Sequence, residues 1–435
     1  MGGAPARGIA ISLDRRQRYP PICTLLLVVS LGWWLCAYPV IREQAFVVSR
    51  QVRPPVLVSY AAFVLVGISA GVSGVLLPSQ MAGYGVDRAT IGITFFTSSA
   101  GFVLGGISTG ALIGRAGVRI ALTAGGGAYV LAGLYLATRP PFAAFVLAQL
   151  VTGYGTGVLE SALNVYLAVL PGAATLLNRL HAFFGAGALL GPALAAWIVG
   201  FASWTVVWLV LAAAYVPLVV GFLVAYPGPE PAAQAPGASV PAPGNMLGAA
   251  LRDRGIQLGA AMLAVYVGLE LSVGTWAFSY LVQARALPDS LAGYTVSGYW
   301  LGLTLGRFLI SPIATRAGAT TAGMMYACLA GVTAAATLAW LSPAALACVA
   351  LGLLGFFLGP VFPTTMAIAP RLTQARLVPT AIGVMNAASA VGGSALPWLA
   401  GTIAQNAGMQ VLLPFAMALA MAQFAIWRPI TGQLG

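Results

Sequence analysis

Two carboxyl groups fall in stretches of the sequence that otherwise hold few polar atoms. Glu160 lies within an apolar run at about 143–170, and Glu270 lies halfway along another at about 256–283. Each run is long enough to span a bilayer as a helix. A carboxylate at membrane depth costs a few kcal/mol, and it can exchange a proton when its surroundings change from dry to wet. We therefore expect both side chains to bind solute or protons, with a structural hydrogen bond as the alternative for each.

The residues around Glu160 form a stripe along one helix face. At about 100° per residue, Gly153, Gly157 and Asn164 share the face of Glu160. Small residues and an amide suit a close helix contact or a wet cavity, and they suit contact with lipid poorly. We expect Asn164 to hold a solute hydroxyl beside Glu160.

Four further side chains within apolar runs are candidates for binding solute. Tyr266 lies one turn from Glu270 on the same face, and Trp276 follows in the same run. Gln149 and Asn386 are amides that could bind either a solute or a neighbouring helix. A site for a polar solute with apolar faces needs one or two flat aromatic surfaces and several hydrogen-bonding groups, although a single aromatic side chain also fits core packing.

The basic residues near these runs have expected roles in gating or structure. Arg307 lies nine residues before Arg316, about 13 Å along a helix, and it could pair with a carboxylate that the sequence does not identify. His181, the only histidine, begins another run. We expect Arg115 and Arg316, which lie between runs, to stabilise one state of the molecule by bonding helix ends across its two parts, and Arg119 to have a gating or structural role.

The composition indicates an all-α membrane protein. Sixty per cent of the residues are hydrophobic and 6% are charged, in continuous runs that a transmembrane barrel would not show. The basic residues are all arginines scattered singly, so the net charge of +12 forms no patch for nucleic acid. The four cysteines follow no metal-binding pattern, and no phosphate-binding loop or nucleophile elbow occurs. We expect no cofactor and no enzymatic activity.

Hydropathy and breaks predict twelve membrane-spanning helices after residue 55. Their expected limits are 57–78, 89–113, 120–138, 142–170, 181–203, 205–226, 256–283, 291–315, 319–341, 344–369, 379–404 and 409–427. The tenth contains LGPVFPTT at 358–365, whose two prolines should break or bend the helix. Such a break can expose backbone groups to a ligand, or it can be a packing kink.

These helices group into regions. We expect an N-terminal extension at 1–55, a six-helix half at 56–226, a flexible Pro- and Ala-rich linker within 227–255, and a second six-helix half at 256–428. The apolar segment 22–41 follows four arginines, so a thirteenth crossing would place these charges outside. We expect that segment to be an addition, either translated from upstream of the true start or lying at the interface.

The arginines indicate the orientation. With the linker in the cytoplasm, eleven arginines at the ends of runs are cytoplasmic and only Arg88, Arg139 and Arg285 lie outside. This distribution satisfies the positive-inside rule and places the C-terminus in the cytoplasm.

The two halves repeat each other at an offset of 201 residues. The triplet Arg-Ala-Gly at 115–117 corresponds to the one at 316–318, and Gly191 and Trp197 correspond to Gly392 and Trp398. A parallel duplication of six-helix units is typical of transporters in which two halves rock about a central site.

GALIGRAGVRIAL at 110–122 resembles the signature loop of the major facilitator superfamily, with Gly114 in place of the usual acid. Four stretches resemble the fucose–galactose–glucose:proton symporter branch of that superfamily, and Glu160 corresponds to its acid in the fourth helix. They are VLLPSQ at 75–80, LESALN at 159–164, YVGLELSVGTW at 266–276 and LGRF at 305–308. The branch's acid in the first helix corresponds to Gly74 here.

The resemblance implies a monomeric transporter in the plasma or inner membrane that moves a small polar solute, most consistently a sugar, by alternating access. It also implies proton symport, with spans one, four, seven and ten lining the cavity. A proton-driven drug exporter and a sensor that binds without transporting remain alternatives. Uptake of labelled sugar would distinguish the first alternative, and flux in proteoliposomes would distinguish the second.

Overall fold

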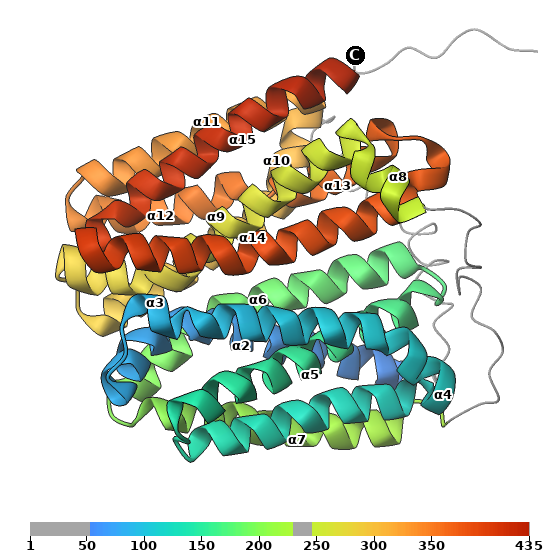
Figure 1. Cartoon of the computed structure of the whole chain (residues 1–435), viewed down its shortest axis with the longest axis vertical. Helices are drawn as coiled ribbons and strands as arrows, with labels where there is room; N and C mark the ends of the chain where they lie inside the picture. Colours follow the sequence, from blue (N-terminus) through green and yellow to red (C-terminus); the bar gives the residue numbers. More distant parts are fainter. Residues whose placement is uncertain (1–52, 229–245, 435) are drawn as a thin grey trace, which may run out of the picture. The chain divides into compact units, whose positions relative to one another are not determined.

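The structure is a computed structural model that describes residues 53–228 and 246–434, and within these ranges it is helical apart from turns. The first range contains α2 (Arg53–Tyr84), α3 (Arg88–Ile91), α4 (Ile93–Ala137), α5 (Phe142–Ala168), α6 (Ala173–Val199) and α7 (Trp204–Ala225) (Figure 1). The second contains α8 (Met246–Arg252), α9 (Arg254–Arg285), α10 (Asp289–Arg316), α11 (Thr321–Leu341), α12 (Ala344–Leu358), α13 (Val361–Leu372), α14 (Val378–Ala407) and α15 (Leu412–Leu434), with short 3₁₀ turns at Ala375–Leu377 and Met409–Val411. The apolar segment 22–41 and most of the linker lie outside the described residues, and α8 forms part of the range expected as linker.

The expected spans correspond to helices. Nine helices in the described ranges are long and apolar enough to cross a membrane, and one of them, 88–137, contains the two expected spans 89–113 and 120–138. The remaining two spans, 291–315 and 379–404, correspond to α10 and α14, which are 28 and 30 residues long. Four helices begin at a residue whose side chain caps the first turn, and these residues are Asp87, Ser203, Asp253 and Thr320.

The repeated Arg-Ala-Gly triplet has a backbone explanation. Gly117 interrupts α4 with φ 81° and ψ 164°, and Gly318 follows α10 with φ 71°. Both backbones adopt positive φ, which glycine tolerates and other residues rarely do. The sequence therefore repeats a glycine at the point where the chain turns after the second helix of each half.

The expected break in the tenth span lies between α12 and α13. The former ends at Leu358 and the latter begins at Val361, so Gly359 and Pro360 separate them. Pro363 lies in the first turn of α13, where a helix does not need its missing N–H. The Gly359 N–H donates to the carbonyl oxygens of Gly355 and Phe356, so the end of α12 is capped within the chain.

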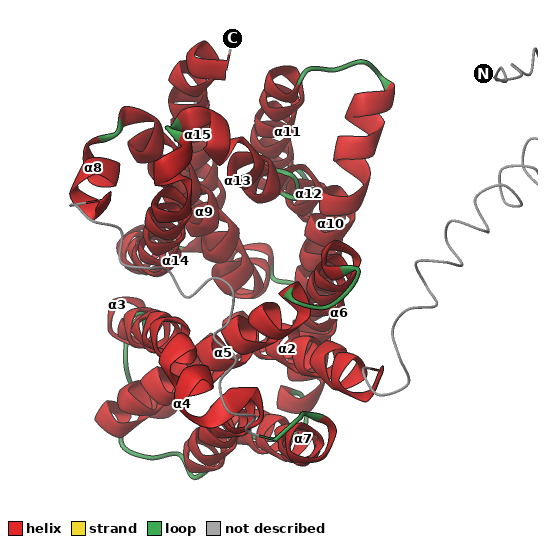
Figure 2. Cartoon of the chain, turned by 90° about the vertical axis from the view of Figure 1, so that its right-hand side faces the viewer, coloured by secondary structure: helices red, strands yellow, loops and turns green. Residues whose placement is uncertain are grey.

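The same helix pairs pack in both halves. α2 packs on α6 and α7, as α9 packs on α14 and α15, and α4 packs on α5 as α10 and α11 pack on α12 (Figure 2). Glycines allow the closest of these contacts. Gly191 of α6 lies against the backbone of Ile68, and its repeat partner Gly392 lies against the backbone of Ala264.

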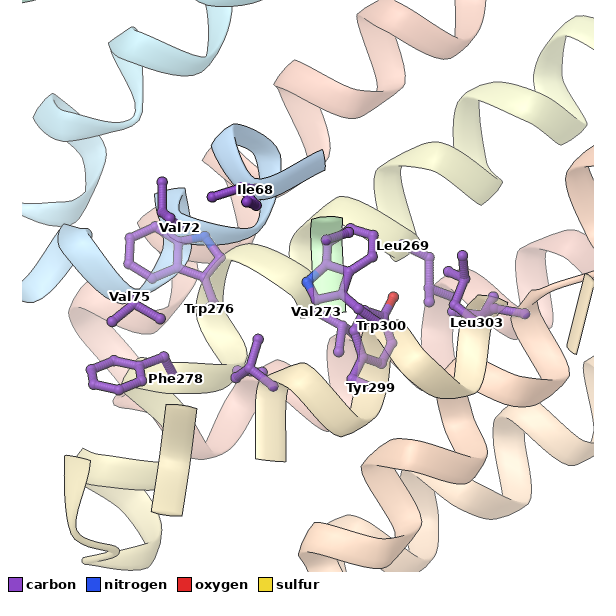
Figure 3. Packing of buried hydrophobic residues seen from close by; sticks show 14 of the residues in the cluster. Ile68, Val72, Val75, Leu269, Val273, Trp276, Phe278, Tyr299, Trp300 and Leu303 are labelled. Atoms are coloured by element: carbon purple, nitrogen blue, oxygen red, sulfur yellow. The ribbon is translucent and has the colours of Figure 1, made fainter. Parts of the chain in front are cut away.

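The two halves contact each other mainly through α6 with α10, α2 with α9, and α4 and α3 with α14. Figure 3 shows Val72 and Val75 of α2 beside Trp276 of α9, within one continuous apolar core. Gly74 of α2 meets the backbone of Gly274 and Thr275, so these helices touch where the first contributes no side chain. The functional side chains are therefore positioned by helices that also form the contact between the halves.

Candidate functional site

The stripe around Glu160 serves two purposes. Gly153 and Gly157 lie against the backbone of Ser98 and Phe102 in α4, so the glycines form a close helix contact. The adjoining edge of α5 carries a row of polar residues four positions apart, namely Thr152, Thr156, Glu160 and Asn164, of which the last three are partly exposed. Small side chains thus hold α5 in place while the polar row remains accessible.

The carboxyl of Glu160 has no hydrogen bond or ion pair with any residue that the structure describes. The amide of Asn164 does not bind it, because its Nδ2 donates to the backbone oxygen of Glu160 at 2.8 Å. One N–H of this amide therefore binds its own helix, while its other N–H and its oxygen make no hydrogen bond with a described residue, so its expected role in holding solute stays a prediction. The carboxyl remains free to bind a proton or a solute.

Glu270 has a partner that the sequence did not identify. Its Oε1 lies 3.4 Å from Nη2 of Arg307 in α10, and the two side chains are 11% and 30% exposed. The hydroxyl of Tyr299 donates to the backbone oxygen of Glu270 at 2.9 Å, which fixes α10 against α9. Two embedded charges of opposite sign on neighbouring spans were the signal that could have suggested this pair.

Two polar atoms beside this pair lack partners. The hydroxyl of Tyr266 is buried and makes no hydrogen bond, and Nε of Arg307 is also buried without one. Tyr266 is nevertheless close enough to Glu270 and Arg307 to interact with them electrostatically. A buried polar atom without a partner costs about 1–3 kcal/mol, so the cluster can form further hydrogen bonds.

His181 belongs to the first half, on the opposite side of the contact between the halves from Arg307. It begins the embedded part of α6, is exposed, and is close enough to interact electrostatically with Arg307. One turn further, Gly185 leaves room for the side chain of Thr304, which lies one turn before Arg307 in α10. Both halves therefore contribute to the surroundings of Arg307.

The other predicted solute ligands lie apart from these groups. Trp276 is fully buried, and its Nε1 donates to the backbone oxygen of Pro397 at 2.8 Å, so its position is that of a core residue. Gln149 is buried and its Oε1 accepts from Thr152 at 3.3 Å within the same helix. Asn386 is exposed on α14 and remains accessible.

One end of the contact between the halves is closed by hydrogen bonds that the sequence did not predict. Gln405 of α14 donates to Oδ2 of Asp87 at 2.8 Å and accepts from the N–H of Ala89 at 3.1 Å. Arg88 donates to Oε1 of Gln283 at 2.7 Å. Hydrogen bonds from Thr90 and Gln405 lower the pKa of the Asp87 carboxyl. We name Asp87, Arg88, Gln283 and Gln405 the end contact.

The opposite end carries the predicted gating arginines. Arg115 and Arg316 are exposed, and neither side chain forms a hydrogen bond or ion pair with a described residue of the other half. Arg119 donates through Nε to the backbone oxygen of Tyr226 at 2.7 Å, so it secures the end of α7 within its own half. We expect Arg115 and Arg316 to bond across the halves in the outward-facing state, and this expectation stays a prediction.

An open groove of about 750 Å³ lies elsewhere, between α11 and α15. Its lining is apolar apart from the hydroxyls of Thr333 and Thr337, which donate to carbonyl oxygens of their own helix. It contains no ionisable group, so it is a poor site for a polar solute. Among the described residues, no three His, Cys, Asp or Glu side chains are grouped as a metal site would require.

Comparison with known sequences finds relatives that include two described as sugar transporters. The chain is 25% identical over 423 residues to "Bypass of stop codon protein 6" of Saccharomyces cerevisiae, covering 86% of this chain and 82% of the relative. It is 22% identical over 359 residues to the glucose/mannose transporter GlcP of Bacillus subtilis, covering 80% and 88%. It is 28% identical over 184 residues to a glucose/galactose transporter of Brucella abortus, covering 39% and 43%.

Solved structures share the fold at low sequence identity. A bacterial homologue of the human lysosomal transporter Spinster matches with a TM-score of 0.73 and 13% identity, over 88% of this chain and 98% of that one. The E. coli fucose:proton symporter FucP matches with a TM-score of 0.57 and 16% identity, over 86% and 98%. These likenesses establish the arrangement of helices.

The family comparison agrees with the duplicated halves, the positive-φ glycine after the second helix of each half, and the embedded charges. Residues 59–397 match the family described as Major Facilitator Superfamily. The chain is therefore a multi-pass membrane transporter and not an enzyme, and it belongs to the major facilitator superfamily.

Proposed function

We propose that this protein is a symporter that uses a proton gradient to take up a small uncharged polar solute of the sugar class, in the plasma or inner membrane. The observation that carries the proposal is the state of Glu160. Its carboxyl lies within a membrane-spanning helix, away from either end, is partly exposed, and binds no other described residue. A carboxyl in this position can take up and release a proton as its access to water changes.

The second embedded acid is a weaker candidate for the proton site. Glu270 is paired with Arg307 at 3.4 Å, so its carboxyl already has a partner of opposite charge. Neutralising Glu270 would leave the guanidinium without its partner, which is costly at membrane depth. We therefore assign proton coupling to Glu160 and solute binding to the region of Glu270.

Sugars are the favoured solutes for two reasons. The relatives in Bacillus subtilis and Brucella abortus are described as glucose/mannose and glucose/galactose transporters. The polar row on α5 offers hydroxyl, carboxyl and amide groups at 152, 156, 160 and 164, and hydroxyl-rich solutes match such groups.

The arrangement of arginines supports an orientation. We place Arg115, Arg316 and the C-terminus in the cytoplasm, because this assignment keeps most arginines on that side. The end contact then lies on the outer side, and this state is closed to the outside. In the same proposal, residues 56–226 and 256–428 are the two moving halves of a monomer, and 227–255 joins them in the cytoplasm.

The test uses proteoliposomes with an imposed proton gradient and labelled D-glucose, D-mannose and D-galactose. We expect the wild-type protein to accumulate at least one of them above the outside concentration. Glu160→Gln, which keeps the shape and hydrogen bonding but cannot titrate, should still exchange internal for external sugar while failing to accumulate it. Undiminished accumulation by Glu160→Gln would refute the coupling role, and absence of any sugar flux in wild type would refute the substrate class.

A further inference from the structure

The guanidinium of Arg307 has more hydrogen-bonding capacity than its surroundings use. A guanidinium carries five N–H donors. Among the described residues, one hydrogen bond engages it, the 3.4 Å contact from Nη2 to Glu270, and the buried Nε has no partner. A charged donor group at membrane depth is normally well satisfied. Arg307 is therefore suited to bind something further.

Tyr266 and Glu270 extend this unused capacity. The Tyr266 hydroxyl is buried without a partner, although it lies within electrostatic reach of both Glu270 and Arg307. The carboxylate of Glu270 accepts one hydrogen bond, at Oε1, from a described residue. The cluster thus contains donors in Arg307 and Tyr266 and an acceptor in Glu270, which together can bind hydroxyl groups.

Arg307 and His181 make part of this area reachable, whereas the Tyr266 hydroxyl is buried. The side chain of Arg307 is 30% exposed despite its position inside α10, and His181 of the first half is exposed beside it. An imidazole can donate one hydrogen bond and accept another when neutral. A solute here would touch both halves, which is the requirement for a ligand whose binding is linked to their movement.

The charges indicate the class of solute. Glu270 balances Arg307, so the pair presents hydrogen-bonding groups without a net charge to attract an anion. We propose that Tyr266, Glu270 and Arg307, with His181 facing them from the first half, form a subsite that binds adjacent hydroxyl groups of an uncharged solute. This inference rests on the proposed function and assigns to solute binding an arginine and a histidine that were expected to be structural.

Direct binding measurements test the subsite. Titration calorimetry on purified full-length protein would use D-glucose, D-mannose and D-galactose, followed by the monodeoxy series of whichever binds most tightly. We expect Tyr266→Phe to weaken binding about tenfold, because one hydrogen bond is lost. The deoxy sugar that lacks the hydroxyl contacted by Tyr266 should bind wild type and Tyr266→Phe equally, a result that a purely structural tyrosine would not give.

Matched controls come from the same chain. Tyr326→Phe removes a hydroxyl from α11 that makes one long contact at 3.5 Å, and Arg316→Gln removes an exposed charge from α10. Both should bind the parent sugar like wild type, whereas Arg307→Gln should weaken binding more than tenfold. Sodium gluconate should bind more weakly than D-glucose.

The outcomes separate the two proposals. If wild type binds sugar and neither Tyr266→Phe nor Arg307→Gln weakens it, the subsite is refuted while the transport function stands. Tighter binding of gluconate than of D-glucose would also refute the subsite, because a balanced pair should not favour an anion. If wild type neither binds nor transports any of the three sugars, both proposals fall together.

Discussion

The two halves carry their embedded charges at positions that do not correspond. Glu270 and Arg307 form a pair in the second half, and the residues 201 positions earlier are Ser69 and Gly106. Glu160 is unpaired in the first half, and its counterpart 201 positions later is Val361. The glycines at the helix contacts and turns, by contrast, recur in both halves.

This difference separates scaffold from chemistry. Residues that set backbone approach and turns are constrained by the shape of a six-helix unit, so a duplicated unit needs them twice. An embedded charge is costly and serves one purpose, so it is needed once. In place of Glu270, the first half has the neutral Ser69, which accepts a hydrogen bond from the Tyr129 hydroxyl at 2.8 Å. We therefore expect substitution of Glu160 and substitution of Glu270 to impair transport in different ways.

The largest expected effect concerns proton movement. Adding sugar to proteoliposomes that contain a pH-sensitive dye should cause proton uptake with wild type. Glu160→Gln should abolish this signal, because it removes the group that titrates. Glu270→Gln should keep the same number of protons per sugar while it raises the sugar concentration needed. Loss of the proton signal in Glu270→Gln with retention in Glu160→Gln would reverse the assignment of the two acids.

The next effect concerns stability of the charged pair. Arg307→Gln leaves the Glu270 carboxylate without its partner, and we expect the free energy of unfolding to fall by about 2–3 kcal/mol, less than for a fully buried pair because Arg307 is 30% exposed. The double variant Glu270→Gln/Arg307→Gln should recover most of this loss. Unfolding in mixed micelles measures the free energy of unfolding of the single and the double variant. If the double variant loses as much as Arg307→Gln, the broken pair is not the cause of the loss.

A third prediction tests the shared scaffold. Gly105→Ala in α4 and Gly306→Ala in α10, which correspond at the 201-residue offset, each place a methyl group against a carbonyl oxygen of the facing helix, that of Tyr154 or Phe356. Each should cost about 1–3 kcal/mol in the free energy of unfolding. Gly110→Ala, which has open space around its Cβ, is the control and should be neutral or stabilising. A large cost in one half alone would contradict an equivalent scaffold.

The smallest effect concerns Asp87, an acid outside the membrane-spanning segments. Its pKa is lowered by hydrogen bonds from Thr90 and Gln405, so its contribution to the end contact is present above its ordinary value of 3.8 and is lost as pH falls through the lowered value. Asp87→Asn should therefore change the transport rate a few-fold at most and leave the pH profile unchanged above about pH 5. A shifted profile in that range would mean that Asp87 contributes to proton coupling.

Sequence patterns predicted the helices better than the contacts between them. Apolar runs predicted the spans, because the ability of a segment to span a membrane depends on its own composition. The two prolines near 360 indicated the break between α12 and α13. The partner of Arg307 could not be assigned, because Glu270 lies on another helix 37 residues away. The end contact was missed for the same reason, since Asp87 and Gln405 are 318 residues apart and exposed polar residues near helix ends are common.

The glycine contact between α4 and α5 determines what kind of movement can change the access of Glu160. Gly153 and Gly157 bring the backbone of α5 directly against that of α4, so neither helix can slide along the other without overlap of main-chain atoms. The carboxyl must then travel as part of a rigid body. Spin-label distances within the first half should stay constant during turnover, while distances from Glu160 to the second half change with each cycle.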